Sequence, residues 1–208
     1  MTEQNMQSLR DDLAYLRALA AEGQQAPLMG GGILAAAGGV FGLASLAHWA
    51  VVAGVLHIPG WALMAIWLTA TAVFMVALFA LKAHYKTRPG AQTSTNRAAG
   101  SAWMGVGFAC FALFVAFFLA SYQTGLWQIM NLFAPVILSL YGAAWTVAAQ
   151  MTRRRWIWAL AMGSFAAAIL TAGLVGRPEQ YLAYAASLVL LAFVPGVIAM
   201  RAEPSDVV

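Results

Sequence analysis

The chain has 208 residues, of which 62% are hydrophobic and only 9% are charged, and its mean hydropathy is +0.77. Soluble globular domains carry about 25% charged residues, so this composition excludes an ordinary soluble domain. The formal charge of +4 does not indicate nucleic-acid binding, because the basic residues lie in short segments beside apolar stretches, where they set the orientation of a membrane protein.

Residues 1–26 are predicted to form a short amphipathic cytoplasmic helix. A signal peptide is excluded because acidic residues occupy the region that should be basic and then apolar: Glu3, Asp11, Asp12 and Glu22. Apolar residues recur at three- and four-residue steps and share one helix face: Met6, Leu9, Leu13 and Leu16. This face is a candidate surface for docking a protein partner or for self-association, and the alternative is a helix packed against its own bundle.

Six apolar stretches follow, and Lys82, at the end of the second, is their one charged residue. They cover about 28–52, 61–82, 98–121, 126–149, 156–176 and 180–200. About 20 apolar residues in an α-helix cross a hydrocarbon core, where only helices or closed barrels satisfy their backbone. We therefore predict an all-α membrane protein in which residues 27–201 form six transmembrane helices, arranged as three antiparallel hairpins, and residues 202–208 form a cytoplasmic tail.

The distribution of Lys and Arg predicts the orientation. With the N-terminus inside, ten basic residues lie on the cytoplasmic side and only Arg177 lies on the other: Arg10, Arg17, Lys82, Lys86, Arg88, Arg97, Arg153, Arg154, Arg155 and Arg201. Both termini are therefore expected in the cytoplasm, and a bacterial inner membrane is the expected location.

Small residues recur every four positions in the odd-numbered spans, which predicts close packing through these faces. The residues are Gly31, Ala35 and Gly39, then Ser101, Gly105 and Ala109, then Ala159, Gly163 and Ala167. The pattern fits a pseudo-repeat of hairpins, although such residues are common in any bundle. Five aromatic residues are predicted to form a belt at the inner boundary: Tyr85, Trp103, Trp145, Trp156 and Trp158.

Titratable chemistry is sparse inside the spans. No Asp or Glu lies there, so proton-coupled antiport through a buried carboxylate is disfavoured. His48 and His57 do not form a pair of facing ligands, and Cys110 has no partner cysteine. We expect no metal site and no cofactor.

The fourth span contains the best polar candidates for a solute pathway, which are Asn131, Pro135, Ser139 and Tyr141. Pro135 cannot donate a hydrogen bond to the carbonyl of Asn131, so a free carbonyl and a side-chain amide share one position. Pro195 with Gly196 predicts a second kink, in the sixth span. The alternative interpretation is that Asn131 joins helices and that neighbouring side chains satisfy the free carbonyl.

One cluster of glycines and one cluster of arginines remain. The Gly30–Gly32 run lacks the Lys and Ser or Thr of a phosphate-binding loop, so we interpret it as a site of close helix packing. Arg153, Arg154 and Arg155 are candidates for binding anionic lipid head groups, although an ordinary cytoplasmic loop has the same composition.

Two classes of function are therefore considered. The first is a non-enzymatic scaffold, sensor or regulatory membrane subunit, which the uncharged spans and short loops favour. The alternative is a small permease or channel for a neutral or weakly polar solute, which requires the polar residues of the fourth span to line one cavity. A lipid-modifying enzyme is third, because no acid–base pair is present.

Overall fold

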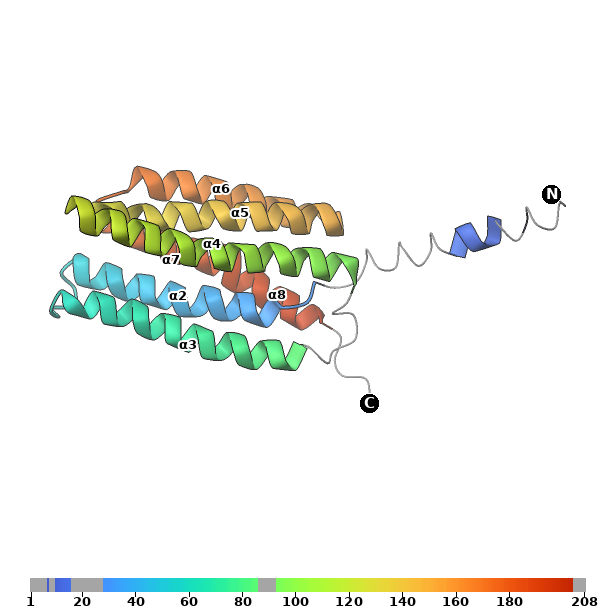
Figure 1. The fold of residues 1–208 in the computed structure, drawn as a ribbon, viewed down its shortest axis with the longest axis horizontal. Coiled ribbons are helices and arrows are strands. Elements are labelled where there is room, and N and C mark those ends of the chain that lie inside the picture. Colours follow the sequence, from blue (N-terminus) through green and yellow to red (C-terminus); the bar gives the residue numbers. More distant parts are fainter. Residues whose placement is uncertain (1–6, 8–9, 16–27, 86–92, 204–208) are drawn as a thin grey trace.

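The computed structural model describes residue 7 and residues 10–15, 28–85 and 93–203. The elements of this part of the chain are all helical. Six helical spans are long and apolar enough to cross a membrane, as predicted. They run side by side along the long axis of the molecule (Figure 1). The chain is an all-α polytopic membrane protein.

Four of the spans are single α-helices: α2 (Gly31–Val52), α3 (Trp61–Tyr85), α4 (Ser94–Thr124) and α6 (Arg155–Gly173). The other two are interrupted. The fourth span consists of the 3₁₀-helix η1 (Trp127–Leu132) and α5 (Phe133–Thr152). The sixth span consists of α7 (Glu179–Leu188), the π-helical turn η2 (Val189–Phe193) and α8 (Val194–Ala202).

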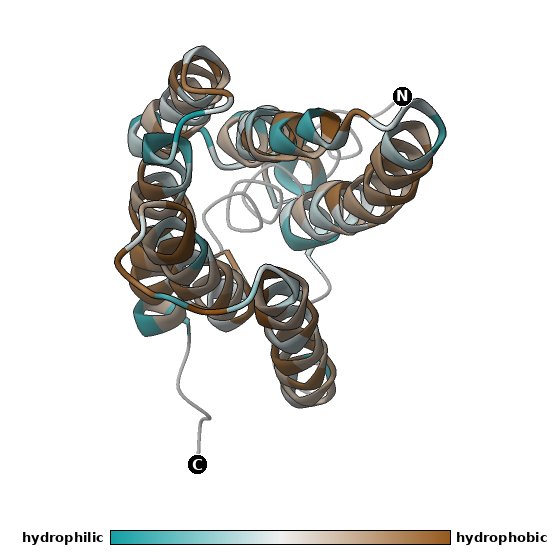
Figure 2. Cartoon of the chain, turned by 90° about the vertical axis from the view of Figure 1, so that its left-hand side faces the viewer, coloured by the Kyte–Doolittle hydropathy of each residue, from teal (hydrophilic) through white to brown (hydrophobic). Residues whose placement is uncertain are grey.

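The spans contact one another in the order α3, α2, sixth span, α6, α5 and α4. The members of each predicted hairpin do touch, but the most extensive contact joins α2 to the sixth span, and the next joins α5 to α6; both pairs belong to different hairpins. The odd-numbered spans pack against even-numbered neighbours. Figure 2, which views the bundle end-on, shows hydrophobic residues on the outer as well as the inner surfaces of the helices.

Glycines on α2 and α8 form a tight seam between the first and sixth spans. A Cβ atom at Gly38 would overlap the backbone nitrogen of Phe193, and one at Gly31 would overlap the backbone nitrogen of Met200. A Cβ at Gly196 would likewise overlap the backbone of Ala35. The close packing predicted for the Gly30–Gly32 run is therefore present at Gly31 and Gly32, whereas a Cβ atom at Gly30 would meet nothing within 4 Å.

The small-residue stripes of the third and fifth spans behave differently from that of the first. Ser101 and Gly105 on α4 are exposed, and Ala159 on α6 is exposed as well. The buried face of α6 is instead formed by Ile157, Ala161, Ser164, Ala168 and Thr171. In the fifth span, however, a Cβ atom at Gly163 would lie 3.1 Å from Leu191 Cδ2, and Ala167 packs against the core. The prediction of close packing is therefore wrong for Ser101, Gly105 and Ala159 and holds for Gly163 and Ala167, because periodicity alone does not say how much of a face meets a neighbour.

The core lies between α5, α6 and the sixth span, around Leu138, Ile157 and Leu188. Trp145 belongs to this core, since only 2% of its surface is exposed, and its ring lies edge-on to Trp103 at 5.3 Å. The predicted inner aromatic belt is therefore wrong for Trp145, which packs in the interior rather than at a membrane boundary.

Candidate functional site

The start of the fourth span is a junction between two helix types. Asn131 lies in the 3₁₀-helix η1, and Pro135 is the third residue of α5. The N–H groups in the first turn of an α-helix have no partner inside that helix, so a proline there breaks no helical hydrogen bond. This corrects the prediction of one long helix with a kink at Pro135.

Asn131 is bound by two side chains of α7. Gln180 Nε2 donates a hydrogen bond to the backbone carbonyl of Asn131 at 2.6 Å. The hydroxyl of Tyr181 donates to Asn131 Oδ1 at 2.8 Å. Asn131 therefore joins the fourth span to the sixth, which is the interhelical role offered above as the alternative to a solute site.

Tyr181 extends this arrangement to the first and second spans. Its ring stacks on the ring of His48 at a centroid distance of 3.7 Å and an interplanar angle of 16°. Ser45 Oγ donates to the backbone carbonyl of Tyr181 at 2.8 Å. Trp67 Nε1 donates to His48 Nδ1 at 2.9 Å. The polar cluster thus links four spans and consists of Ser45, His48, Trp67, Asn131, Gln180 and Tyr181.

The hydrogen bond from Trp67 determines the proton position on His48. An indole N–H can only donate, so Nδ1 of His48 accepts and the neutral ring carries its proton on Nε2. In the part of the chain that the structure describes, no group of three His, Cys, Asp or Glu side chains could hold a metal ion. His48 serves here as a hydrogen-bond acceptor and stacking partner between helices.

A second contact between the fourth and sixth spans involves Trp145. Its Nε1 donates to the backbone carbonyl of Leu191 at 3.0 Å. Leu191 lies in the π-helical turn, four residues before Pro195, which has no N–H to donate to that carbonyl. The interruption predicted near Pro195 is thus present as a π turn, and a side chain of α5 satisfies the carbonyl that the proline leaves free.

Ser139 and Tyr141 lie on different sides of α5. Ser139 Oγ donates to the carbonyl of Pro135 at 3.0 Å. Ser139 also lines a shallow, largely apolar groove of about 320 Å³ between α5 and α6, together with Pro135, Val136, Phe165, Ala168, Ile169 and Ala172. Tyr141 is buried in the core, edge-on to Trp103 at 5.1 Å. The structure therefore does not bring Asn131, Ser139 and Tyr141 together around one cavity.

Two buried side-chain oxygens find no hydrogen-bond partner among the described residues. They are Gln180 Oε1 in α7 and Ser121 Oγ near the end of α4. A buried polar atom without a partner costs about 1–3 kcal/mol, so Gln180 uses its amide donor at the expense of its acceptor. Gln180 could not be identified from the sequence, since a single Gln at the start of a span carries no distinctive signal.

The opposite end of the bundle, called the basic end here, contains the start of α2 and the turn between α5 and α6. Glu203 Oε1 accepts hydrogen bonds from the backbone N–H groups of Gly30 and Gly31, both at 3.0 Å. Asn96 Oδ1 accepts from Met29 N at 3.0 Å, and the Tyr85 hydroxyl accepts from Gly32 N at 3.1 Å. Four successive N–H groups at the start of α2 are thus satisfied by side chains from other parts of the chain.

This arrangement corrects the assignment of Glu203 to the tail of residues 202–208. Glu203 is only 8% exposed, and α8 continues as far as Ala202. No pattern in the sequence indicates this contact, because the two partners are separated by more than 170 residues. Residues 204–208 lie outside the described residues.

The predicted docking face of the N-terminal helix is described only in part. Residues 10–15 are helical, and Leu13 is 51% exposed on this helix. Met6, Leu9 and Leu16 lie outside the described residues. Arg153, Arg154 and Arg155 are all exposed, at the turn between α5 and α6.

The chemistry available at the polar cluster is that of neutral donors and acceptors paired between helices. Such pairs fix the relative position of spans but supply no nucleophile, acid or base matched to a substrate. No protein-family model matches the chain, and neither a curated protein nor a solved structure resembles it at a significant level.

Proposed function

We propose that the protein is a non-enzymatic membrane component, a scaffold, sensor or regulatory subunit, that acts by associating with another transmembrane helix through α4. The two spans at the edges of the bundle support this proposal. Only 6% of the α3 span and 11% of the α4 span are buried, whereas between 33% and 50% of each other span is buried. These two helices therefore have broad surfaces available to a neighbour.

One observation on α4 carries the proposal. Its exposed side includes the small residues Ser101, Gly105 and Ala112, which lie on one face around Phe108. A Cβ atom at Gly105 would meet nothing within 4 Å, so the glycine serves no packing role inside the bundle. We call Ser101, Gly105, Phe108 and Ala112 the α4 face.

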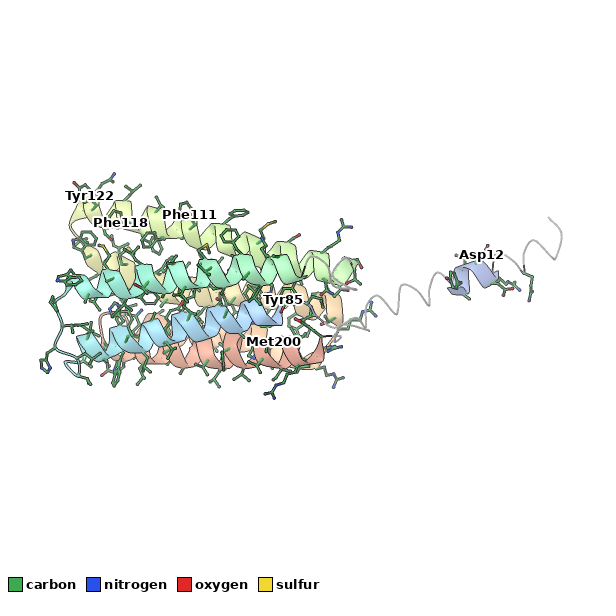
Figure 3. The ribbon with its side chains drawn as sticks, turned by 90° about the horizontal axis from the view of Figure 1, so that it is seen from below. Asp12, Tyr85, Phe111, Phe118, Tyr122 and Met200 are labelled. Atoms are coloured by element: carbon green, nitrogen blue, oxygen red, sulfur yellow. The ribbon has the colours of Figure 1, made fainter. Side chains whose placement is uncertain are left out.

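The physics of membranes makes small residues more informative than large ones on such a surface. Lipid tails are as apolar as Leu or Phe, so exposed aromatic residues do not by themselves drive association. Figure 3 shows such residues along α4, at Phe111, Phe118 and Tyr122. Small residues instead let two backbones approach closely, which allows the van der Waals contact that holds transmembrane helices together.

The partner proposed for the α4 face is a second copy of the chain. All copies insert in the same orientation, so two α4 helices would meet in parallel about a two-fold axis along the membrane normal. In a two-fold interface the same patch is used on both subunits, so each small residue would face the small face of the other copy.

The polar cluster also favours this proposal over a permease. A solute pathway needs polar groups that are free to bind the solute. The backbone carbonyl and Oδ1 of Asn131 each accept a hydrogen bond from α7, and Ser139 donates to its own helix.

The test is to fill the α4 face without disturbing the fold. Gly105→Leu and Gly107→Leu both add a side chain where nothing lies within 4 Å, but about 200° apart on the helix. Energy transfer between donor- and acceptor-labelled copies in liposomes measures the apparent affinity of self-association. This affinity should fall at least tenfold for Gly105→Leu and remain unchanged for Gly107→Leu. A wild-type chain that stays monomeric over the accessible concentrations, or equal losses in both variants, would contradict the proposal.

A further inference from the structure

The turn between α5 and α6 concentrates positive charge in very little chain. Helix α5 ends at Thr152 and α6 begins at Arg155, so only Arg153 and Arg154 connect them. Arg153, Arg154 and Arg155 are all exposed. Three consecutive guanidinium groups therefore lie at one point on the basic end of the bundle.

The backbone of this turn adopts a conformation that an arginine does not favour. Arg153 has φ of 54°, in the left-handed region, and is the one non-glycine residue with positive φ in the described part of the chain. Gly or Asn would adopt this conformation at lower cost in free energy. The chain therefore has a basic residue where backbone geometry alone would favour a different one.

The three arginines have no acidic partner among the residues that the structure describes. Within these residues no ion pair or hydrogen bond involves their side chains, and the first turn of α6 contains no acid. Of the four acids that the structure describes, Glu203 is engaged with the start of α2 and Glu179 lies at the far end of the bundle. Asp11 and Asp12 lie on the helical segment of residues 10–15, and Figure 3 shows Asp12 away from the bundle. The charge of the turn is therefore uncompensated within the described protein.

Two tryptophans place this turn at the depth of lipid head groups. Trp156 and Trp158 lie in the first turn of α6 and are 39% and 36% exposed. Indole rings prefer the boundary between hydrocarbon and head groups, where the ring is in apolar surroundings and the N–H reaches water. The adjacent guanidinium groups would then lie at the level of the lipid phosphates.

We propose that Arg153, Arg154 and Arg155 form a binding site for the head group of an anionic phospholipid. A guanidinium group presents paired N–H donors that match the oxygens of a phosphate, and it remains charged in any membrane environment. The net negative charge of the lipid is what distinguishes it from a zwitterionic lipid with the same phosphate. The proposal concerns a different part of the molecule from the α4 face and does not depend on self-association.

The experiment measures retention of defined lipids by the purified full-length protein. Native mass spectrometry in detergent compares binding of palmitoyl-oleoyl phosphatidylglycerol with binding of the matching phosphatidylcholine. Wild type should prefer phosphatidylglycerol. Because each basic residue near the surface is worth about fivefold in binding, Arg153→Asn with Arg154→Gln and Arg155→Gln should reduce this preference at least about tenfold.

The chain offers a charge-matched control at the same end of the bundle. Lys82, Arg97 and Arg201 are exposed on α3, α4 and α8, so Lys82→Gln with Arg97→Gln and Arg201→Gln removes the same charge elsewhere. This control should keep the preference. Equal loss in both triple variants would overturn the proposal in favour of a diffuse surface charge, and an unchanged preference in the turn variant would overturn it outright.

Two further measurements keep the result interpretable. The double variant Arg154→Gln with Arg155→Gln leaves the left-handed residue 153 untouched, and it should lose part of the preference while retaining the wild-type melting temperature. Inorganic phosphate at millimolar concentration should not displace phosphatidylglycerol. Displacement by free phosphate would show a soluble-anion site and would contradict a site for lipid.

Discussion

The indole N–H of Trp145 donates to the backbone carbonyl of Leu191, the carbonyl that lies four residues before Pro195. The reverse relationship is present at the other proline, because Gln180 of the sixth span donates to the carbonyl of Asn131, four residues before Pro135 in the fourth. Each of these two spans therefore donates a hydrogen bond to the backbone carbonyl that lies four residues before the proline of the other span. In hydrocarbon no water can do this, so the two hydrogen bonds make the irregular helices compatible with the membrane.

Trp145→Phe should lower the free energy of unfolding by about 1–2 kcal/mol, because the carbonyl of Leu191 loses its donor inside the bundle. The size of the loss should depend on the proline. In a Pro195→Ala background a backbone N–H becomes available near that carbonyl, so the same tryptophan substitution should cost less. Unfolding in SDS, followed for the four chains of this double-mutant cycle, measures the difference.

Trp158→Phe is the matched control for the loss of an indole. Trp158 is partly exposed, so its substitution should change the free energy of unfolding by only a few tenths of a kcal/mol. Equal costs for Trp145→Phe with and without Pro195 would contradict the assignment, since the contribution would then come from packing against Trp103 rather than from the hydrogen bond.

The number and limits of the spans could be read from the sequence because hydropathy over about 20 residues reports directly on the membrane-crossing segments. The interruptions of the fourth and sixth spans could not be read from it in the same way. Whether Pro135 breaks a helix depends on where α5 begins, and the start of a helix is set by local hydrogen bonds that hydropathy does not describe. The order of spans was equally hidden, so close packing was predicted for all of the small residues on α4 and α6, although Ser101, Gly105 and Ala159 are exposed.

The candidate site could be predicted only as far as local chemistry allows. Asn131 could be singled out because a side-chain amide four residues before a proline is unusual inside a span. Its partner Gln180 lies 49 residues away, and the pairing follows from which helices are neighbours, a property that no single segment encodes. The contact of Glu203 with the start of α2 was missed for the same reason.

Tyr181→Phe should remove the hydrogen bond to Asn131 while keeping the ring that stacks on His48. Interhelical hydrogen bonds in membranes contribute about 0.6 kcal/mol on average, so we expect a loss of about that size. Trp67→Phe should cost a similar amount through the lost bond to His48 Nδ1. If His48 couples the two sites, the double variant will depart from additivity in SDS unfolding, whereas strict additivity would show that the two bonds act independently.

Glu203→Ala should destabilise the basic end by about 1–2 kcal/mol, because the N–H groups of Gly30 and Gly31 lose their acceptor. Glu203→Gln keeps an acceptor oxygen and should lose only the charge at the helix start, about 0.3–1 kcal/mol. Glu179→Gln removes an exposed acid from the first turn of α7 at the far end, so it should cost about as much as Glu203→Gln and is the control for the loss of a charge at a helix start. Thermal unfolding in detergent ranks the three variants, and equal stability of Glu203→Ala and wild type would refute a stabilising role.

Gly38→Ala should be strongly destabilising for a single methyl group. The added Cβ would overlap the backbone of Phe193, so α2 and the sixth span would have to separate, and overpacking of this kind costs about 1–3 kcal/mol. Gly107→Ala adds the same methyl group where nothing lies within 4 Å and should be neutral or slightly stabilising. Because Ala favours the helix over Gly, helix propensity would stabilise both variants, and only the seam makes Gly38→Ala unfavourable. Equal stability of the two variants would therefore contradict the role of the seam.

Cysteine labelling distinguishes a packed fourth span from a solute pathway. With Cys110 replaced by Ser, single cysteines at positions 139 and 141 place thiols in the groove between α5 and α6 and in the core beside Trp103. A membrane-impermeant maleimide should label neither, because the groove is lined almost entirely by apolar residues and the core is closed. A cysteine at exposed Gln123, in the last turn of α4, should label fully and serves as the positive control. Labelling at both 139 and 141 would require water on both sides of α5, and it would move the functional assignment from a scaffold to a permease for a neutral solute.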